Sequence, residues 1–238
     1  TVSLEPIPVY YENIVWPNVS GITLAGGVGA TSRNVIIDGG AAGSIITINQ
    51  TVSASIQTLT LRNGSNGDPD QGGGAIAVGS AVTFLGLTDV FVTGNAADNK
   101  GGAIYFGGDS AVGSWIENCY FSNNQANYGG AISASYNLYI AGTVFDSNVA
   151  SVNGGAIYAA GVTVDNNANP ITLDYVVVSY NYISNGTGAG MYSLSPVYIS
   201  NSLFDSNRVT ISGTTGALYV SGSFTILTSS FNNNVSTG

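Results

Sequence analysis

Apolar residues occupy every second position in short runs along most of this chain, and polar, glycine-rich stretches separate the runs. A spacing of two is the period of a β-strand, whereas an amphipathic helix repeats every 3.6 residues. Branched and aromatic residues, which favour strands, supply many of these positions. The pattern therefore predicts many short strands and essentially no helix.

The runs can be aligned on a series of asparagines, and columns of inward-pointing residues then become visible. Counted back from each asparagine, apolar or small residues recur at offsets of 10, 8, 5 and 3. The step from offset 8 to offset 5 is out of phase by one residue, which indicates a corner after which the chain still points inward. The columns at offsets 8 and 3 are Leu87, Ile116, Ile140, Leu173, Ile199 and Ile226, and Val92, Phe121, Phe145, Val178, Phe204 and Phe231.

A second motif marks a third strand in each repeat. Gly-Gly-Ala-Ile occurs at residues 73–76, 101–104, 129–132 and 154–157, and weaker copies follow at 188–192 and 216–219. The aligned asparagines at 95, 124, 148, 181, 207 and 234 are 29, 24, 33, 26 and 27 residues apart. Repeats of 20 to 50 residues are typical of solenoids, in which each unit buries its apolar face against its neighbours. We therefore predict an all-β fold, a right-handed parallel β-helix (β-solenoid) with three short strands per turn.

The aligned asparagines have a structural explanation. Backbone groups at a tight corner leave the hydrogen-bond ladder, and burying them unpaired is unfavourable. An asparagine amide can donate to and accept from groups in adjacent turns, and asparagine tolerates a left-handed backbone. The paired glycines are expected at the opposite corner, where a positive φ or a close backbone approach is needed. We predict one structural ladder along the axis, made by Asn95, Asn124, Asn148, Asn181, Asn207 and Asn234.

These two linked motifs resemble those of a known family. Gly-Gly-Ala-Ile and Phe-x-x-Asn alternate, as at 101–104 and 121–124 and again at 129–132 and 145–148. They are similar to the repeats of polymorphic outer membrane proteins and to other β-helix surface proteins and autotransporter passengers, and the resemblance covers about residues 60–238. It implies a secreted, surface-exposed adhesin. This chain differs from that pattern in its low content of charged residues and in having one cysteine.

Two parts of the chain are expected. Residues 1–20 are irregular, rich in proline and aromatic residues, and are predicted to form an N-terminal arm or cap, whereas residues 21–238 form a single β-helix domain. An open β-helix end exposes unpaired backbone and core side chains, so it needs a cap. The last repeat, around Phe231 and Asn234, keeps its inward pattern and has no covering segment. We therefore expect head-to-tail self-association, and the alternative is a longer passenger whose next turn covers this end.

The composition limits the kinds of molecule that the chain is expected to bind. Four basic and thirteen acidic side chains, with no histidine, give the 238 residues a net charge of −9. An acidic chain without a basic patch is not expected to bind nucleic acid. Membrane insertion is not expected either, because no run of 18 apolar residues is present. The start at Thr1 without methionine is consistent with a removed signal peptide or a fragment of a longer protein.

A polysaccharide lyase or hydrolase is the enzymatic alternative, because many parallel β-helices act on acidic polysaccharides. Such sites need clustered carboxylates, and a lyase also needs a basic proton acceptor. Glu117 and Asp174 share a column but lie two turns apart, roughly 10 Å at about 4.8 Å per turn, and Arg208 stands alone. Asp68 and Asp70 are a close acidic pair that favours turn chemistry over a calcium site. We expect no enzyme activity, no catalytic or metal-binding residues and no cofactor.

Two rows of side chains are expected to point outward along the solenoid. A continuous apolar stripe on a surface indicates a contact region. Three interpretations stay open: cross-strand stabilisation, packing against another subunit or the N-terminal arm, and stacking on sugars. The two rows are Phe91, Tyr120, Val144, Val177 and Leu203 on one strand, and Tyr105, Tyr158, Tyr192 and Tyr219 on another.

Three asparagines in expected loops are candidates for glycosylation, namely Asn18, Asn63 and Asn185. Such sequons occur about as often as the composition predicts by chance, so their number is not informative. Cys119 lies in the offset-5 column and is predicted to fill space in the core rather than to react.

The sequence thus predicts a non-enzymatic, extracellular structural or adhesive β-solenoid, a cell-surface filament subunit or adhesin that assembles end to end. Its partners would be further copies of itself and a host or neighbouring-cell surface or its glycans. The alternative is a monomeric adhesin passenger fragment of the autotransporter type.

Overall fold

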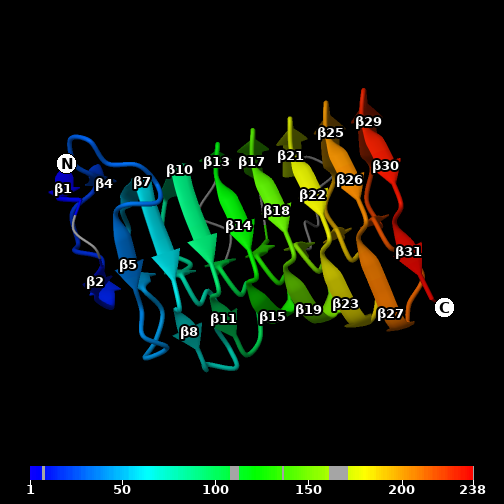
Figure 1. The fold of residues 1–238 in the computed structure, drawn as a ribbon, viewed down its shortest axis with the longest axis horizontal. Helices are drawn as coiled ribbons and strands as arrows, with labels where there is room; N and C mark the ends of the chain where they lie inside the picture. The colour runs from blue at the N-terminus through cyan, green and yellow to red at the C-terminus, as the bar shows by residue number, and fades with distance from the viewer. Residues whose placement is uncertain (7–8, 108–112, 136, 161–170, 238) are drawn as a thin grey trace.

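Three parallel sheets form the walls of a solenoid whose turns follow one another from the N-terminal to the C-terminal end (Figure 1). The computed structural model describes residues 1–6, 9–107, 113–135, 137–160 and 171–237. Within these ranges the chain forms strands and no helix, and strands of successive turns pair in parallel. The predicted all-β parallel β-helix is therefore confirmed.

The largest sheet has sixteen strands, because most turns contribute two strands to it. Its strands are β1 (Val2–Leu4), β2 (Tyr10–Tyr11), β4 (Ile22–Gly26), β5 (Ile36–Asp38), β7 (Ser53–Arg62), β10 (Phe84–Thr93), β13 (Ser114–Glu117), β14 (Tyr120–Ser122), β17 (Leu138–Ala141), β18 (Val144–Asp146), β21 (Ile171–Asp174), β22 (Val177–Ser179), β25 (Val197–Ser200), β26 (Leu203–Asp205), β29 (Phe224–Leu227) and β30 (Ser230–Asn232).

The two smaller sheets receive one strand each from most turns. The seven-stranded sheet contains β8 (Ser65–Asn66), β11 (Ala96–Ala97), β15 (Gln125–Tyr128), β19 (Val149–Asn153), β23 (Tyr182–Asn185), β27 (Arg208–Ser212) and β31 (Val235–Ser236). The eight-stranded sheet contains β3 (Ile14–Val15), β6 (Ile46–Ile48), β9 (Ile76–Val78), β12 (Ile104–Phe106), β16 (Ile132–Ala134), β20 (Ile157–Ala159), β24 (Met191–Ser193) and β28 (Leu218–Val220).

The core is a continuous column of side chains inside these walls. Phe121 lies opposite Val92 on one side and Phe145 on the other, and all three are fully buried. The Phe121 and Phe145 rings stack with their centroids 5.0 Å apart. Because adjacent turns are in register, each inward column that the sequence predicts becomes a continuous apolar stack.

Two left-handed corners bend each turn beside the sixteen-stranded sheet. Positive φ angles occur six residues and one residue before each ladder asparagine, whereas the asparagines themselves are not among the positive-φ residues. The phase break between offsets 8 and 5 is therefore one left-handed residue. The left-handed residues are Asp89, Asn118, Gly142, Tyr175, Asn201 and Thr228, and Gly94, Asn123, Ser147, Tyr180, Ser206 and Asn233.

The Gly-Gly pairs form the third corner, as predicted. Gly101 has a φ of 59°, and a Cβ at this position would lie 2.0 Å from the carbonyl oxygen of Ile104. A Cβ on Gly102 would lie 2.2 Å from the carbonyl oxygen of Gly130 in the next turn. Only glycine satisfies both the backbone angle and the close approach between turns.

The first and last turns differ in how their side chains are covered. Strands β1, β2 and β3 of residues 1–20 pair in parallel with β4, β5 and β6, and Trp16 is buried. The arm thus continues the sheets, and its boundary at residue 20 stays a prediction. In the last turn Phe231 is 39% exposed, whereas Phe204 beneath it is fully buried.

Candidate contact surface

The six predicted ladder asparagines form one column of side-chain hydrogen bonds. Asn124 Nδ2 donates to Asn148 Oδ1 at 3.0 Å and to the carbonyl oxygen of Val92 at 3.0 Å. The same Asn148 oxygen also accepts the backbone N–H of Asn124 at 3.1 Å. This arrangement continues along the axis to Asn234, and Asn95 to Asn207 are buried. The column satisfies corner groups of adjacent turns, which is a structural role.

The outward tyrosine row is a second stack. Tyr158 and Tyr192 have ring centroids 5.3 Å apart, and Tyr192 and Tyr219 are 4.9 Å apart with nearly parallel rings. Ser133 occupies the row between Tyr105 and Tyr158, and there the ring of Tyr128 lies 5.0 Å from Tyr158. Sequence alternation missed Tyr128. The rings therefore cover one another's faces and leave mainly their edges and hydroxyls to solvent.

The other outward row is covered in part by the chain itself. Phe91 and Tyr120 stack with centroids 5.0 Å apart, and the guanidinium of Arg33 lies 5.5 Å from the Phe91 ring centroid. Arg33 comes from the segment between β4 and β5, which belongs to the early turns. The Tyr120 hydroxyl donates to Asp146 at 3.3 Å. Burial, followed by the nearby Asp146 charge, raises the pKa of Tyr120. The row thus combines cross-strand stacking with packing inside the chain.

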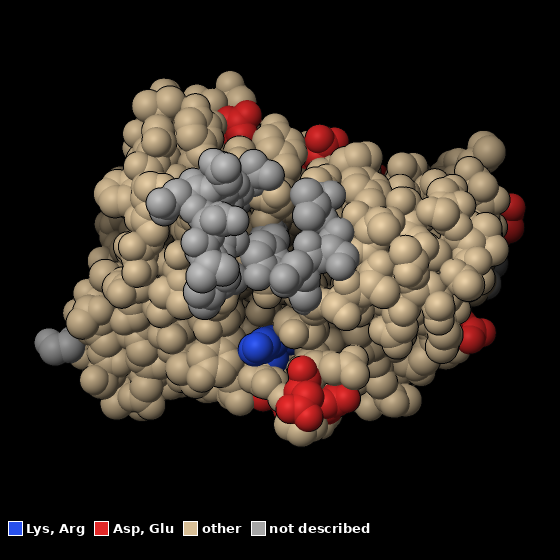
Figure 2. Space-filling view, turned by 180° about the vertical axis from the view of Figure 1, so that it is seen from behind, with Lys and Arg blue, Asp and Glu red and all other residues tan. Residues whose placement is uncertain are grey.

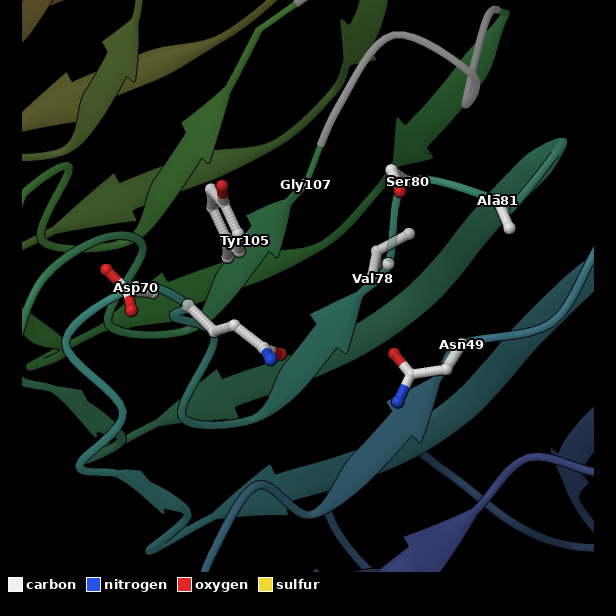
Figure 3. Close-up of a pocket in the computed structure, with 9 residues that line it drawn as sticks. Asn49, Asp70, Val78, Ser80, Ala81, Tyr105 and Gly107 are labelled. Atoms are coloured by element: carbon white, nitrogen blue, oxygen red, sulfur yellow. The ribbon is translucent and has the colours of Figure 1, made fainter.

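A hollow of about 510 Å³ lies beside Tyr105 on the eight-stranded sheet (Figure 3). In this view Tyr105 and Asp70 lie at one end of the hollow and Asn49 at the other, with Val78 between them. Gln71 and Ser80 also line it. Burial raises the pKa of Tyr105, so its hydroxyl stays protonated and can donate at neutral pH. Sequence reasoning found Tyr105 but not the concave surface around it.

Trp115 is an exposed aromatic side chain that sequence reasoning missed. The indole is 37% exposed and meets Phe84 edge to face with centroids 4.5 Å apart. It also covers Gly86 of the preceding turn, where a Cβ would lie 2.9 Å from Trp115 Cε2. Tyr139 follows in the same column and is 40% exposed. Side chains alternate along a strand, so the inward position of Ile116 could have been used to predict that both residues point outward.

The carboxylates of the described residues do not form a cluster of three or more. Ala141 separates Glu117 from Asp174 in their shared column. Asp174 accepts hydrogen bonds from Ser200 Oγ at 2.7 Å and Asn201 Nδ2 at 2.9 Å, and these bonds hold its pKa below the usual value. Among the described residues, no three of His, Cys, Asp and Glu gather in a way that could hold a metal ion.

The acidic loop before the first Gly-Gly-Ala-Ile has turn geometry. The backbone N–H of Asp70 donates to Asp68 Oδ1 at 2.9 Å, and that of Asp68 donates to Asn66 Oδ1 at 2.9 Å. Both bonds are the short-range contacts by which Asp and Asn side chains cap turns.

Cys119 lies in the core, whereas the three candidate glycosylation sites lie on the surface. Cys119 is buried, and burial raises the pKa of its thiol to about 12. Asn18, Asn63 and Asn185 are exposed. Asn63 Nδ2 already donates to Asp38 at 2.9 Å, so a glycan on Asn63 would have to break this bond.

Charged side chains are sparse on the face opposite to that of Figure 1, as Figure 2 shows. This follows from a composition with 7% charged residues. Among the described residues, no helix has the length and apolar character needed to cross a membrane.

Comparison with known proteins identifies the repeat. The Chlamydia polymorphic membrane protein repeat matches residues 89–107, 118–135 and 142–160. Each match begins at the first left-handed corner, passes through a ladder asparagine and includes the Gly-Gly-Ala-Ile corner. The chain is a parallel β-helix protein of the polymorphic membrane protein repeat type. The matched segments therefore contain the residues that build the corners of this repeat.

A curated relative extends the similarity beyond these three segments. The Probable autotransporter YfaL of Escherichia coli (strain K12) is 33% identical over 171 residues, which are 68% of this chain and 13% of that protein. The matched part of the chain is thus a small fraction of that relative's length. No solved structure matches this repeat protein.

Proposed function

We propose that this chain is a surface-exposed, non-enzymatic β-helix segment of an autotransporter-type passenger, with a structural and adhesive role. The match of the polymorphic membrane protein repeat to three successive turns carries this proposal. The similarity to a probable autotransporter supports the same location. A stacked β-helix is a rigid spacer that keeps its outer faces at a defined distance from its attachment point.

Surface labelling tests this location. Antibodies raised against the purified chain should stain intact, unpermeabilised cells of the source organism, and added protease should remove the signal. Beads coated with the folded chain should adhere to other cells more than beads coated with the heat-denatured chain do. Staining only after permeabilisation would contradict the proposed location.

The absence of enzyme activity is part of the proposal. Glu117 and Asp174 are separated by an intervening turn, and Arg208 is exposed on the seven-stranded sheet. A lyase needs a base close to its bound substrate, and a hydrolase needs two carboxylates across one bond. The chain should therefore release no unsaturated product from polygalacturonate, with or without calcium. A reproducible rise in product absorbance that is abolished by Asp174→Asn or Arg208→Ala would overturn this part.

End-to-end association is a second candidate function, favoured by the surface of the last turn. Phe224 is 61% exposed and Leu227 is 48% exposed, and their strand β29 pairs on one side only within these 238 residues. An unpaired strand with apolar side chains is a template for another β-helical turn. A contact of one end with the other end of a second copy does not close and would form a fibre.

Light scattering over a concentration series tests this association. The wild-type chain should form elongated assemblies, and Phe224→Lys with Leu227→Lys should prevent them. Tyr175→Lys, on an exposed corner of the side wall, is the matched control and should leave assembly unchanged. A chain that stays monomeric at high concentration would contradict end-to-end association. It would favour instead a longer polypeptide whose next turn pairs with this edge.

A further inference from the structure

Two exposed tyrosines lie at the two left-handed corners that flank β22. Tyr175 is 65% exposed and Tyr180 is 60% exposed, and their backbone φ angles are 53° and 54°. A positive φ is uncommon for any residue other than glycine and is least favourable for bulky side chains. The adjacent turns have small residues at the same corners, namely Gly142 and Asn201 beside Tyr175, and Ser147 and Ser206 beside Tyr180.

Neither tyrosine ring contributes to the packing of the fold. Among the described residues, neither ring stacks on another aromatic ring, and neither hydroxyl has a hydrogen-bond partner. The small neighbours leave both rings in solvent. Residues that adopt an unfavourable backbone conformation without a packing role are frequently functional. Tyr175 and Tyr180 therefore indicate a contact surface between them.

The face between the two tyrosines has an apolar centre and an acidic side. Val144, Val177 and Leu203 point outward from β18, β22 and β26, which lie side by side (Figure 1). Asp146 and Asp205 follow two residues further along β18 and β26 and are partly exposed. Among the described residues, neither of these carboxylates forms an ion pair. The face thus offers hydrophobic contact together with uncompensated negative charge.

An earlier part of the same outward row is already covered by a basic segment of the chain itself. Thr60 and Phe91 precede Val144 in this row. The Thr60 hydroxyl donates to the carbonyl oxygen of Ser32, and the guanidinium of Arg33 lies 5.5 Å from the Phe91 ring centroid. A cation over an aromatic face is a favourable contact. The row therefore accepts an arginine-bearing segment where the chain provides one.

We propose that the face between Tyr175 and Tyr180 docks an extended, basic segment of a partner protein, with arginine or lysine side chains against the two rings and the nearby carboxylates. Asp146, Asp205 and the net charge of −9 favour a partner of positive charge. At about 3.3 Å per residue, the Cα atoms of the two tyrosines are at most roughly 16 Å apart. Side chains four residues apart on an extended segment, about 13 Å from each other, reach both rings. The proposal names a partner class for the adhesive role and rests on the proposed function in this respect.

Peptide binding to the full chain tests this proposal directly. The probes are twelve-residue peptides in which arginine, lysine, glutamate or glycine alternates with serine, and calorimetry at physiological salt measures their affinity. The arginine and lysine peptides should bind at least tenfold more tightly than the glutamate and glycine peptides. Higher salt should weaken their binding because it screens the charges.

A double variant removes the rings without changing the net charge. Tyr175→Asn with Tyr180→Ser introduces the residue types that the next turn has at these corners, and should lower the affinity for the arginine peptide at least tenfold. Because asparagine tolerates a positive φ better than tyrosine, this variant should melt no lower than wild type. Tyr11→Ser, at a 72% exposed position near the N-terminal end of the same sheet, is the control and should stay within twofold of wild type.

A second pair of variants separates the local charge from the net charge. Asp146→Asn with Asp205→Asn should lower the affinity for the arginine peptide at least threefold. Asp68→Asn with Asp70→Asn makes the same change in net charge in the loop before the first Gly-Gly-Ala-Ile, and should leave the affinity within twofold of wild type. Equal losses in the two variants would mean that the net charge attracts the peptide, and would overturn the proposal.

Four further outcomes would overturn the proposal. These are a failure of both basic peptides to bind, wild-type affinity in the folded tyrosine double variant, a melting temperature of that variant well below wild type, and self-association of the wild-type chain that the same variant abolishes. The last outcome would identify a second copy as the occupant. Surface labelling of cells is independent of these measurements. Stained cells with no peptide binding would reject the docking face alone, and peptide binding with unstained cells would reject the location alone.

Discussion

The inner phenylalanine column and the outer tyrosine row have nearly the same stacking geometry in opposite environments. Phe121 and Phe145 stack at 5.0 Å with an interplanar angle of 11°, and Tyr158 and Tyr192 stack at 5.3 Å and 13°. The phenylalanines are fully buried, whereas the tyrosines are half-buried. Strand register alone therefore stacks any aromatic residue that recurs in a column. A stack of rings on the outer surface is therefore no sign of a binding site by itself.

Truncating one ring in each stack should separate the contribution of burial to stability from the contribution of ring stacking. Phe145→Ala leaves a cavity among fully buried neighbours and should lower the free energy of unfolding by about 3–5 kcal/mol. Tyr192→Ala removes similar ring contacts next to solvent and should lower it by about 1–2 kcal/mol. Urea unfolding followed by circular dichroism measures both. Equal losses would mean that stacking, and not burial, dominates the stability of this solenoid.

A substitution in the asparagine ladder should have the next largest effect on stability. The Asn148 amide accepts the backbone N–H of Asn124 and donates to the carbonyl oxygen of Phe121 and to Asn181 Oδ1. Because Asn148→Leu removes these bonds and leaves buried corner groups unpaired, it should lower the free energy of unfolding by about 1–3 kcal/mol. Asn185→Leu, at an exposed position, is the control and should change it by less than about 0.5 kcal/mol. Wild-type-like urea unfolding of Asn148→Leu would contradict the structural role of the ladder.

The interior could be predicted from the sequence because each inward position repeats in every turn. The apolar columns, the asparagine ladder and the glycine corners all follow from chemistry that only a few residue types provide. The sequence did not predict which residue of each corner has a positive φ. Residues as different as Tyr175, Asn201 and Thr228 have a positive φ at equivalent corners. The fold, and not the residue type, therefore imposes this backbone angle.

The outer surface could be predicted only where alternation holds. The register between β15 and β19 shifts between Ala126 and Tyr128, so counting by twos cannot place the ring of Tyr128 in the row. Arg33 reaches Phe91 from a segment more than one turn away, and no local pattern encodes that contact. The hollow likewise depends on where the loop carrying Asp70 and Gln71 passes beside the sheet.

Alkaline pH should affect the outer row through its hydroxyls, and this is the smallest expected effect. Burial, followed by the charges of Tyr192 and Tyr128, raises the pKa of Tyr158 above its usual value of 10.0. Below pH 10 the phenol is neutral in both the folded and the unfolded chain, so its contribution to stability is fully present. As the pH rises through 10 and towards the raised pKa, the unfolded chain ionises first and stability is lost. Tyr158→Phe keeps the stacked ring without the hydroxyl, so its melting temperature should fall less than that of wild type between pH 8 and pH 11. Parallel declines in the two proteins would mean that the Tyr158 hydroxyl ionises as freely in the folded state as in the unfolded state.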